Sequence, residues 1–237
     1  MSISENIAET RERISNAARR AGRDPRDISL MAVTKTVSPE RIREAYEAGV
    51  RLFGENRVQE FQEKSQAFRD LPDFRCHMIG HLQSNKARSA VELFDGIDSV
   101  DSLRLAHRLS TAAQELGKRL PVLIEINIGG ETSKSGFTAG SAELEELLQS
   151  ASNLALNIHG LMAVPPFADD PEASRLYFRK LRGIYEEVKA RRLPGIDMQI
   201  LSMGMSHDFE VAIEEGATCV RVGSAIFGER PKAAVRR

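Results

Sequence analysis

The sequence predicts an α/β protein, a single (β/α)8 TIM barrel preceded by an N-terminal helix. Eight short apolar runs alternate with longer charged segments of helical periodicity, which is typical of βα units and a parallel sheet. No Pro/Gly/Ser-rich linker interrupts the 237 residues, a length near the ~250 residues of many such barrels. We therefore expect one domain over residues 1–237. A doubly wound sheet is the alternative, because periodicity alone does not close a sheet into a barrel.

The expected strands are the apolar runs themselves. They cover residues 29–33, 51–54, 74–80, 94–100, 121–128, 156–164, 198–204 and 218–224. The N-terminal helix is expected over residues 4–21, because Ile7, Ile14 and several alanines recur at helical spacing among charged residues. Gly22 then follows as a residue that ends helices.

Capping residues mark where most of the other expected helices begin. Ser and Asp at the N-cap, and Pro in the first turn, favour the start of a helix. The expected starts are Ser38-Pro39, Asp101-Ser102, Ser141 and Asp170-Pro171, and two further helices, 207–216 and the short Ser224–Phe227, follow the last two strands. Gly49 and Gly117 stand where C-terminal caps belong.

Composition narrows the class of partner. The 33 Lys and Arg residues against 34 Asp and Glu leave a net charge of -1, which gives no indication of nucleic acid or an anionic membrane. Cys76 and Cys219 are too few for a disulfide framework or a metal motif. The charged N-terminus lacks the apolar core of a signal peptide, and no stretch approaches the ~18 apolar residues of a membrane span. We expect a cytoplasmic protein with a small-molecule partner.

Lys35 follows the first expected strand, at the end of a barrel where active sites lie. A lysine that loses hydration in a barrel mouth has a lowered pKa, and its neutral amine can form a Schiff base with an aldehyde or ketone. Two structural alternatives are a side chain that extends to solvent and an ion pair with Glu55 at the neighbouring strand end.

The segments after the seventh and eighth expected strands have the composition of a phosphate site. Gly204 and Gly223 permit close approach to the backbone, and Ser206 and Ser224 add hydroxyl groups. Ser206 also opens the expected helix 207–216, whose N-terminus attracts an anion. The structural alternative is that Ser206 only caps this helix and that Gly223 only forms a tight turn.

Arg221 lies inside the last expected strand, where alternation points its side chain to the face opposite Val220 and Val222. There it needs an anion or another acceptor. A cofactor with both an aldehyde and a phosphate would satisfy Lys35, Arg221 and the two serines together. Pyridoxal 5'-phosphate carries both groups, and an arginine or aspartate is a usual partner of its pyridine nitrogen.

Six segments, in order along nearly the whole chain, carry a family resemblance. They are AVTKTVSPERIREA, FGENRVQE, HMIGHLQSNK, SKSGF, LSMGMSHDFEVAIEEGAT and VRVGSAIFGER. Together they resemble the YggS/PROSC family, the pyridoxal phosphate homeostasis proteins (PLPBP). The resemblance implies a barrel similar to the N-terminal domain of alanine racemase, of fold type III, that holds pyridoxal 5'-phosphate as an internal aldimine.

The resemblance also implies roles for particular residues. Lys35 would form the aldimine, and Arg221 would face the pyridine nitrogen. The phosphate would be held by Ser206, Gly223 and Ser224, and the ring would be lined by Asn56 and Met203. The family often has threonine at the position of Ser224, which retains the hydroxyl. An arginine at the nitrogen disfavours the protonated ring, so carbanion chemistry is assisted less than beside an aspartate.

The expected function is therefore a carrier that binds pyridoxal 5'-phosphate, takes part in its intracellular homeostasis and passes it to apo-enzymes. The alternative is a catalytic enzyme such as an amino-acid racemase. Without the resemblance, a Schiff-base aldolase acting on a phosphorylated sugar fits the same residues. Racemisation needs a second acid/base group, which related racemases supply as a tyrosine from an additional domain. Tyr46, Tyr177 and Tyr185 fall in expected helices, and the chain ends at Arg237, which favours the carrier.

Three further expectations follow. The resemblance implies a monomer, and the residues themselves leave open whether any substrate is turned over. His81 follows the third expected strand and is a candidate to approach the cofactor, although a hydrogen-bonded structural histidine is the main expectation. Lys134 is a candidate for binding an anion at the barrel mouth.

Overall fold

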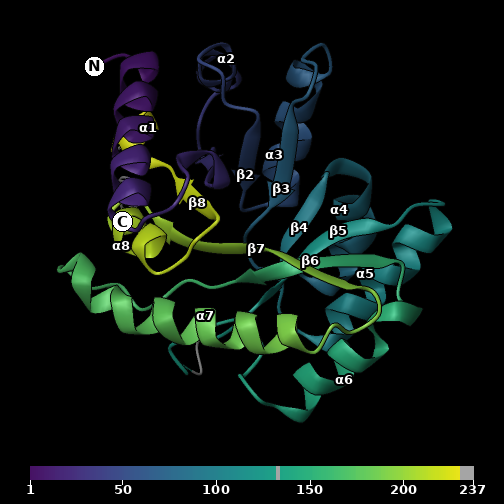
Figure 1. The fold of residues 1–237 in the computed structure, drawn as a ribbon. Helices are drawn as coiled ribbons and strands as arrows, with labels where there is room; N and C mark the ends of the chain where they lie inside the picture. The colour runs from purple at the N-terminus through teal and green to yellow at the C-terminus, as the bar shows by residue number, and fades with distance from the viewer. Residues whose placement is uncertain (132–133, 230–237) are drawn as a thin grey trace, which may run out of the picture.

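The structure is a computed structural model that describes residues 1–131 and 134–229. Within these residues, eight parallel strands close into a barrel in sequence order, with β8 paired to β1 (Figure 1). The predicted barrel is confirmed, and the doubly wound alternative is wrong. The strands are β1 Ser29–Val33, β2 Leu52–Glu55, β3 Arg75–Met78, β4 Gly96–Val100, β5 Leu120–Glu125, β6 Leu156–Met162, β7 Ile196–Met205 and β8 Cys219–Val222.

Helices surround the barrel, and the expected N-terminal helix is present as α1. The α-helices of the described residues are α1 Ile3–Arg20, α2 Pro39–Glu47, α3 Val58–Lys64, α4 Ala87–Leu93, α5 Leu103–Glu115, α6 Ala142–Ser150, α7 Arg175–Ala190, α8 Phe209–Glu214 and α9 Ser224–Phe227. Short 3-10 helices cover Pro25–Asp27, Ser65–Phe68, Ser84–Lys86, Ala151–Asn153 and Pro171–Ser174. No helix in the described part of the chain is long and apolar enough to cross a bilayer.

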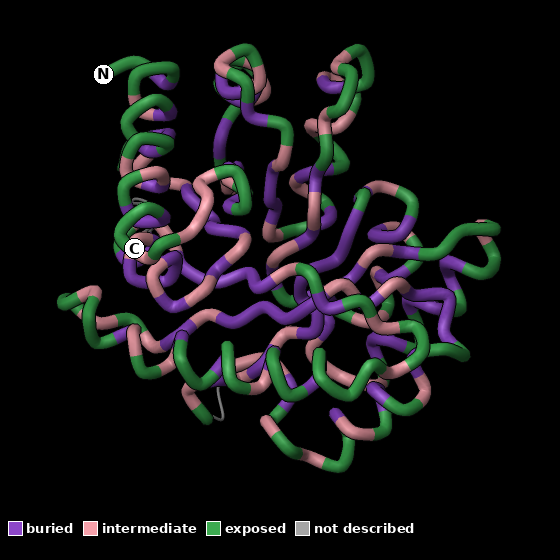
Figure 2. Tube along the Cα trace, in the orientation of Figure 1, coloured by how far each residue is buried: buried purple, intermediate pink, exposed green. Residues whose placement is uncertain are grey.

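Burial follows the two layers of a barrel. The strands are mostly buried, whereas the outer faces of the helices are exposed (Figure 2). Side chains such as Phe53 and Phe178 are almost fully buried. The sequence shows this arrangement because strands covered on one side by helices and on the other by the barrel interior read as nearly continuous apolar runs.

Helix caps explain which helices the sequence predicts. Ser102 and Ser141 cap α5 and α6, because each hydroxyl accepts a backbone N–H bond, from Leu105 at 3.4 Å and from Leu144 at 3.2 Å. The sequence gives no start signal for α3 and α4. Their N-cap residues are basic, Arg57 and Lys86, and neither makes a side-chain capping bond.

The strand β7 is irregular where it approaches the barrel mouth. Its pairing with β8 shifts between Ser202 and Met205, and Gly204 has a φ of 89°. A Cβ atom on Gly204 would lie only 2.5 Å from the Ala212 Cβ. Glycine at this position therefore permits both the left-handed backbone and the close packing of α8 on β7.

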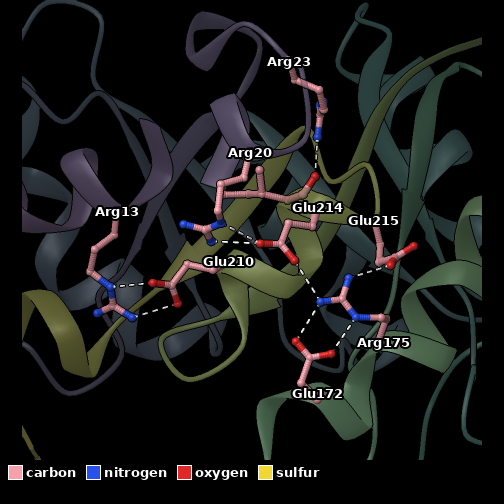
Figure 3. A network of polar contacts seen from close by, with 9 residues as sticks. Arg13, Arg20, Arg23, Glu172, Arg175, Glu210, Glu214 and Glu215 are labelled. Carbon is pink, nitrogen blue, oxygen red and sulfur yellow. Dashed lines mark hydrogen bonds and ion pairs between the residues drawn. The ribbon is translucent and has the colours of Figure 1, made fainter. Parts of the chain in front are cut away.

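Ion pairs outside the barrel connect α8 to α1 and α7. Arg175 of α7 contacts Glu214 at 2.8 Å and Glu215 at 2.7 Å (Figure 3). Arg13 of α1 makes a two-point contact with Glu210, with both distances 2.9 Å. Arg175 donates hydrogen bonds to Glu172, Glu214 and Glu215, and these bonds, that to Glu172 first, raise the pKa of Arg175. Both neighbouring helices therefore hold α8, which follows the loop that carries Ser206.

Candidate functional site

A cavity of about 610 Å³ opens at the carboxyl ends of the barrel strands. This is the end of a (β/α)8 barrel that carries binding sites. Six of the seven residues that the sequence assigned to the site line the cavity: Lys35, Asn56, Ser206, Arg221, Gly223 and Ser224. The fold thus brings together residues that are up to 189 positions apart in the sequence, from Lys35 to Ser224.

Met203 differs from the other six residues. Its side chain is fully buried in the hydrophobic core and is not among the residues that line the cavity, whereas Met205 is. The shifted pairing between Ser202 and Met205 and the left-handed Gly204 interrupt the alternation of β7. An irregularity of this kind changes which residues of a strand face the barrel interior. The alternation of residues in the sequence does not reveal such an irregularity.

Arg221 points into the barrel interior, as alternation predicts. The residue is only 3% exposed. Its guanidinium donates to the Ser202 Oγ at 2.7 Å and to the Ala163 carbonyl oxygen at 2.8 Å. Burial lowers the pKa of Arg221, while nearby groups that include Asp98 and Glu125 act in the opposite direction. The protein thus supplies acceptors that fix the orientation of this cation.

Ser206 connects the loop after β7 to the start of α9. Its hydroxyl oxygen accepts the backbone N–H of Gly223 at 3.1 Å and that of Ala225 at 3.4 Å. The expectation that Ser206 opens or caps the following helix is wrong, because α8 begins at Phe209 and its N-cap is Asp208. Ser206 instead brings together the two loops that the sequence predicts to hold a phosphate.

Lys35 lies half-buried in the turn that follows β1. The Val37 N–H donates to the Thr34 carbonyl oxygen at 3.0 Å and closes this turn. Glu55, the partner considered for Lys35 in the sequence, forms an ion pair with Lys64 at 3.1 Å. Lys35 lines the cavity. It follows β1, which pairs with β8, the strand that carries Arg221.

Asn56 presents an acceptor that the described protein leaves unused. Its Oδ1 atom is buried and has no hydrogen-bond partner among the described residues. Buried polar atoms are nearly always hydrogen-bonded in folded proteins. Asn56 lines the cavity, so a ligand with a suitably placed donor would form a hydrogen bond with this acceptor.

Gly80 lies in the loop after β3, against the backbone of Asn56. A Cβ on Gly80 would lie 2.5 Å from the Asn56 carbonyl oxygen, so glycine permits the close approach of this loop.

Two acidic residues, Asp101 after β4 and Glu125 at the end of β5, lie at neighbouring strand ends across the barrel from β1, which Lys35 follows. Burial and the Asp101 carboxylate raise the pKa of Glu125, at the end of β5, to about 7. His81 Nδ1 lies 2.7 Å from Asp101 Oδ2 and 3.0 Å from Ser135 Oγ. His81 is therefore hydrogen-bonded, as expected, and it is not among the residues that line the cavity. The sequence does not single out Glu125, because this residue lies inside the apolar run 121–128.

Lys134, Phe167 and His207 lie in the segments that follow β5, β6 and β7. Lys134 forms an ion pair with Glu131 and donates to the Pro165 carbonyl oxygen at 3.4 Å. Phe167 and His207 line the cavity, and their ring centroids are 5.9 Å apart. The sequence offers a signal for this rim, since Phe167 is an aromatic residue in a proline-containing segment just after a strand end.

The family model of the alanine racemase N-terminal domain matches residues 6–231. A pyridoxal phosphate homeostasis protein of Aquifex aeolicus is 44% identical over 231 residues, which cover 97% of this chain and 99% of the relative. The protein of the same description from Escherichia coli (strain K12) is 45% identical over 233 residues, 96% of this chain and 97% of the relative.

A solved structure has the same architecture. It is PipY of Synechococcus elongatus with pyridoxal phosphate bound, which is 39% identical, with a TM-score of 0.83 over 96% of this chain and 100% of PipY. Family model, curated relatives and solved structure agree over nearly the whole chain. This chain belongs to the family of pyridoxal phosphate homeostasis proteins, which is built on the barrel of the alanine racemase N-terminal domain.

Proposed function

We propose that this chain binds pyridoxal 5'-phosphate in the cavity at the barrel mouth and serves as a carrier in pyridoxal phosphate homeostasis. One observation carries the proposal. The half-buried Lys35, the buried Arg221 and the two loops joined by the bond between Ser206 and Gly223 all line the same cavity. The relatives named for pyridoxal phosphate homeostasis, and PipY with pyridoxal phosphate bound, support it.

The residues present fit this cofactor. When bound, pyridoxal phosphate supplies an aldehyde that reacts with a primary amine and a ring that withdraws electrons. Lys35 would provide the amine. The loops joined by Ser206, with Gly223 and Ser224, would hold the phosphate through hydroxyl and backbone N–H groups. Asn56 would accept a hydrogen bond through its unpartnered Oδ1. Met205, which lines the cavity, would lie beside the ring in place of Met203, the residue that the resemblance implies.

Arg221 favours a carrier over an enzyme. A fixed cation beside the pyridine nitrogen disfavours protonation of that nitrogen, so the ring is a weaker electron sink. Two tyrosine hydroxyls are engaged elsewhere, since Tyr46 donates to the Pro72 carbonyl oxygen and Tyr185 to the Met198 carbonyl oxygen. No tyrosine is among the described residues that line the cavity. These observations support binding and release rather than racemisation.

The remaining parts of the proposal concern the state of the protein in the cell. We propose that residues 1–237 act as one domain, that the protein is a cytoplasmic monomer, and that pyridoxal phosphate-dependent apo-enzymes receive its cofactor. The lack of a charge excess, with a net charge of -1, supports partners other than nucleic acid.

Two assays test the proposal. The purified protein, freed of ligand, should bind pyridoxal 5'-phosphate in equilibrium dialysis. The bound cofactor should absorb visible light at longer wavelength than free cofactor. The loaded protein should leave the optical purity of single-enantiomer amino acids unchanged. Failure to bind would contradict the proposal as a whole, and clear racemisation would contradict the carrier and favour the enzyme.

A further inference from the structure

Helix α3 contacts the turn that carries Lys35 on both sides of that residue. Lys64, the last residue of α3, donates from Nζ to the Thr34 carbonyl oxygen at 3.1 Å. Glu60, one helical turn earlier, accepts the Thr36 backbone N–H at 2.5 Å. Thr34 and Thr36 flank Lys35 directly, so one short helix fixes the backbone before and after the lysine.

These contacts belong to a largely buried charged cluster, which we define as Thr34, Glu55, Glu60 and Lys64. Lys64 Nζ lies 2.6 Å from Glu60 Oε1 and 3.1 Å from Glu55 Oε1, and its side chain is 12% exposed. The Thr34 hydroxyl donates to the same Glu55 oxygen at 2.7 Å. With the Thr34 carbonyl oxygen, the ammonium has an acceptor for each of its three N–H groups.

The turn that the cluster holds is strained. Thr36 has a φ of 64°, a left-handed conformation that β-branched residues rarely adopt. The turn runs from Thr34 to Val37 and is closed by the 3.0 Å bond between them, which puts Thr36 at the third position. Glycine or asparagine is the usual residue where the third position of a turn has positive φ. Strained residues of this kind persist when the surrounding structure over-determines them, and they concentrate at functional sites.

We propose that Glu60 and Lys64 are positioning residues that hold the strained turn so that the Lys35 amine faces the cavity before a ligand arrives. The inference rests on the proposed function, since it takes Lys35 as the residue that bonds the cofactor. Neither Glu60 nor Lys64 is among the residues that line the cavity. Both therefore act on Lys35 through the backbone of the turn rather than by touching the ligand.

The position of an amine matters for covalent capture far more than for binding through a phosphate. Displacing a reacting group by about 1 Å can slow a reaction by about 100-fold, because the reacting atoms lose their near-attack geometry. The phosphate loops belong to β7, β8 and α9, on other elements of the barrel. Loss of the cluster should therefore slow capture of an aldehyde by Lys35 and leave phosphate recognition intact.

The test uses two ligands on the full chain. Pyridoxal 5'-phosphate reports capture by Lys35, through the rate of the visible absorbance change and the fraction fixed by borohydride. Pyridoxine 5'-phosphate has an alcohol in place of the aldehyde, so its equilibrium dissociation constant reports the phosphate and ring contacts alone. The key variant is Glu60→Ala, which removes the acceptor of the Thr36 N–H and changes no residue that lines the cavity.

For Glu60→Ala we expect the second-order rate constant of pyridoxal 5'-phosphate capture to fall about tenfold or more, with the dissociation constant of pyridoxine 5'-phosphate unchanged. Glu60→Gln retains an oxygen acceptor, so its rate should lie between those of Glu60→Ala and the wild type, and it serves as the variant least disturbing to folding. Glu92→Ala is the matched control, because Glu92 forms the same type of i,i+4 ion pair with Arg88 on α4 and lies outside the cavity.

The outcomes separate the two proposals. If the wild type binds neither ligand, both the proposed function and this inference are contradicted. If the wild type captures pyridoxal 5'-phosphate and both Glu60 variants capture it equally fast, the positioning role alone is contradicted. Equal losses for both ligands in both variants would also contradict it, because they would indicate a general loss of structure.

Discussion

Arg221 Nη1 donates a hydrogen bond to Ser202 Oγ at 2.7 Å within the closed barrel. Its Nη2 donates to the Ala163 carbonyl oxygen at 2.8 Å, just beyond the end of β6. Two neighbouring strand segments, β7 and the end of β6, therefore supply acceptors that fix this cation of β8. The arginine is oriented before any ligand binds, which is the condition for a preorganised site.

Replacing Arg221 by methionine should lower the free energy of unfolding by about 1–3 kcal/mol, because the buried Ala163 carbonyl oxygen would lose its donor. Ser202→Ala removes the acceptor of a buried, charged donor and should cost about 1.5–3 kcal/mol. Urea unfolding measures both. Arg26→Met is the control, since the Arg26 side chain is 89% exposed and its loss should change little. Equal stabilities of Arg221→Met and Arg26→Met would contradict the structural role of the buried guanidinium.

Glu125 should make stability depend on pH. Its folded pKa is raised from 4.5 to about 7, first by burial and then by Asp101. The folded state thus keeps a proton that the unfolded state has released, so stability is lost as pH rises from about 4.5 towards about 7. Glu125→Gln cannot ionise. Its advantage over the wild type should grow across this window to at most about 3 kcal/mol.

Urea unfolding of both proteins at about pH 5 and about pH 8 measures this difference. A difference between variant and wild type that is the same at the two pH values would show that Glu125 does not titrate in this window. A larger advantage at the lower pH would reverse the sign and contradict the buried position of the carboxyl group.

Ser206→Ala should weaken binding of pyridoxal 5'-phosphate by about tenfold, since the Gly223 and Ala225 N–H groups lose the oxygen that aligns the two phosphate loops. Equilibrium dialysis measures the effect. Ser141→Ala is the matched control: its hydroxyl accepts the Leu144 N–H at the start of α6. This control should lose about 1 kcal/mol of stability and no affinity. Equal affinities of Ser206→Ala and the wild type would exclude a role for this hydroxyl in the site.

Gly204→Ala should destabilise the protein by about 2 kcal/mol or more, because alanine must adopt an unfavourable positive φ and its Cβ would meet α8. The nearest atoms would be the Ala212 Cβ at 2.5 Å and the Phe209 Cα at 2.9 Å. Gly117→Ala has the strained φ of 64° but no heavy atom within 4 Å of the added Cβ, so it should cost less. A cost for Gly204→Ala no greater than that for Gly117→Ala would contradict the close contact with α8.

The sequence predicts the barrel because every strand is an apolar run between charged, helix-period segments. Strand ends are less predictable. The run at 121–128 extends beyond β5, which ends at Glu125, because Ile126 and Ile128 are buried in the following segment as well. The helices α3 and α4 lack a typical N-cap residue, so the sequence does not indicate where they begin.

The site is predictable where it depends on strand ends and alternation, and unpredictable where it depends on irregular backbone or distant contacts. Lys35 and Arg221 are apparent from their positions in and after apolar runs. Met205 requires knowledge of the shifted pairing in β7. The hydrogen bond between Lys64 and Thr34 joins residues thirty positions apart, so no local sequence pattern predicts it.

The central claim is that Lys35 forms the covalent link to pyridoxal 5'-phosphate. Its most direct test is borohydride treatment of the loaded protein, followed by digestion and mass spectrometry of the labelled peptides, with Lys35→Ala treated in parallel. We expect the label on the peptide that contains Lys35 and no label at saturating cofactor in Lys35→Ala. A label on another lysine of the wild type, such as Lys134, or full labelling of Lys35→Ala, would contradict it.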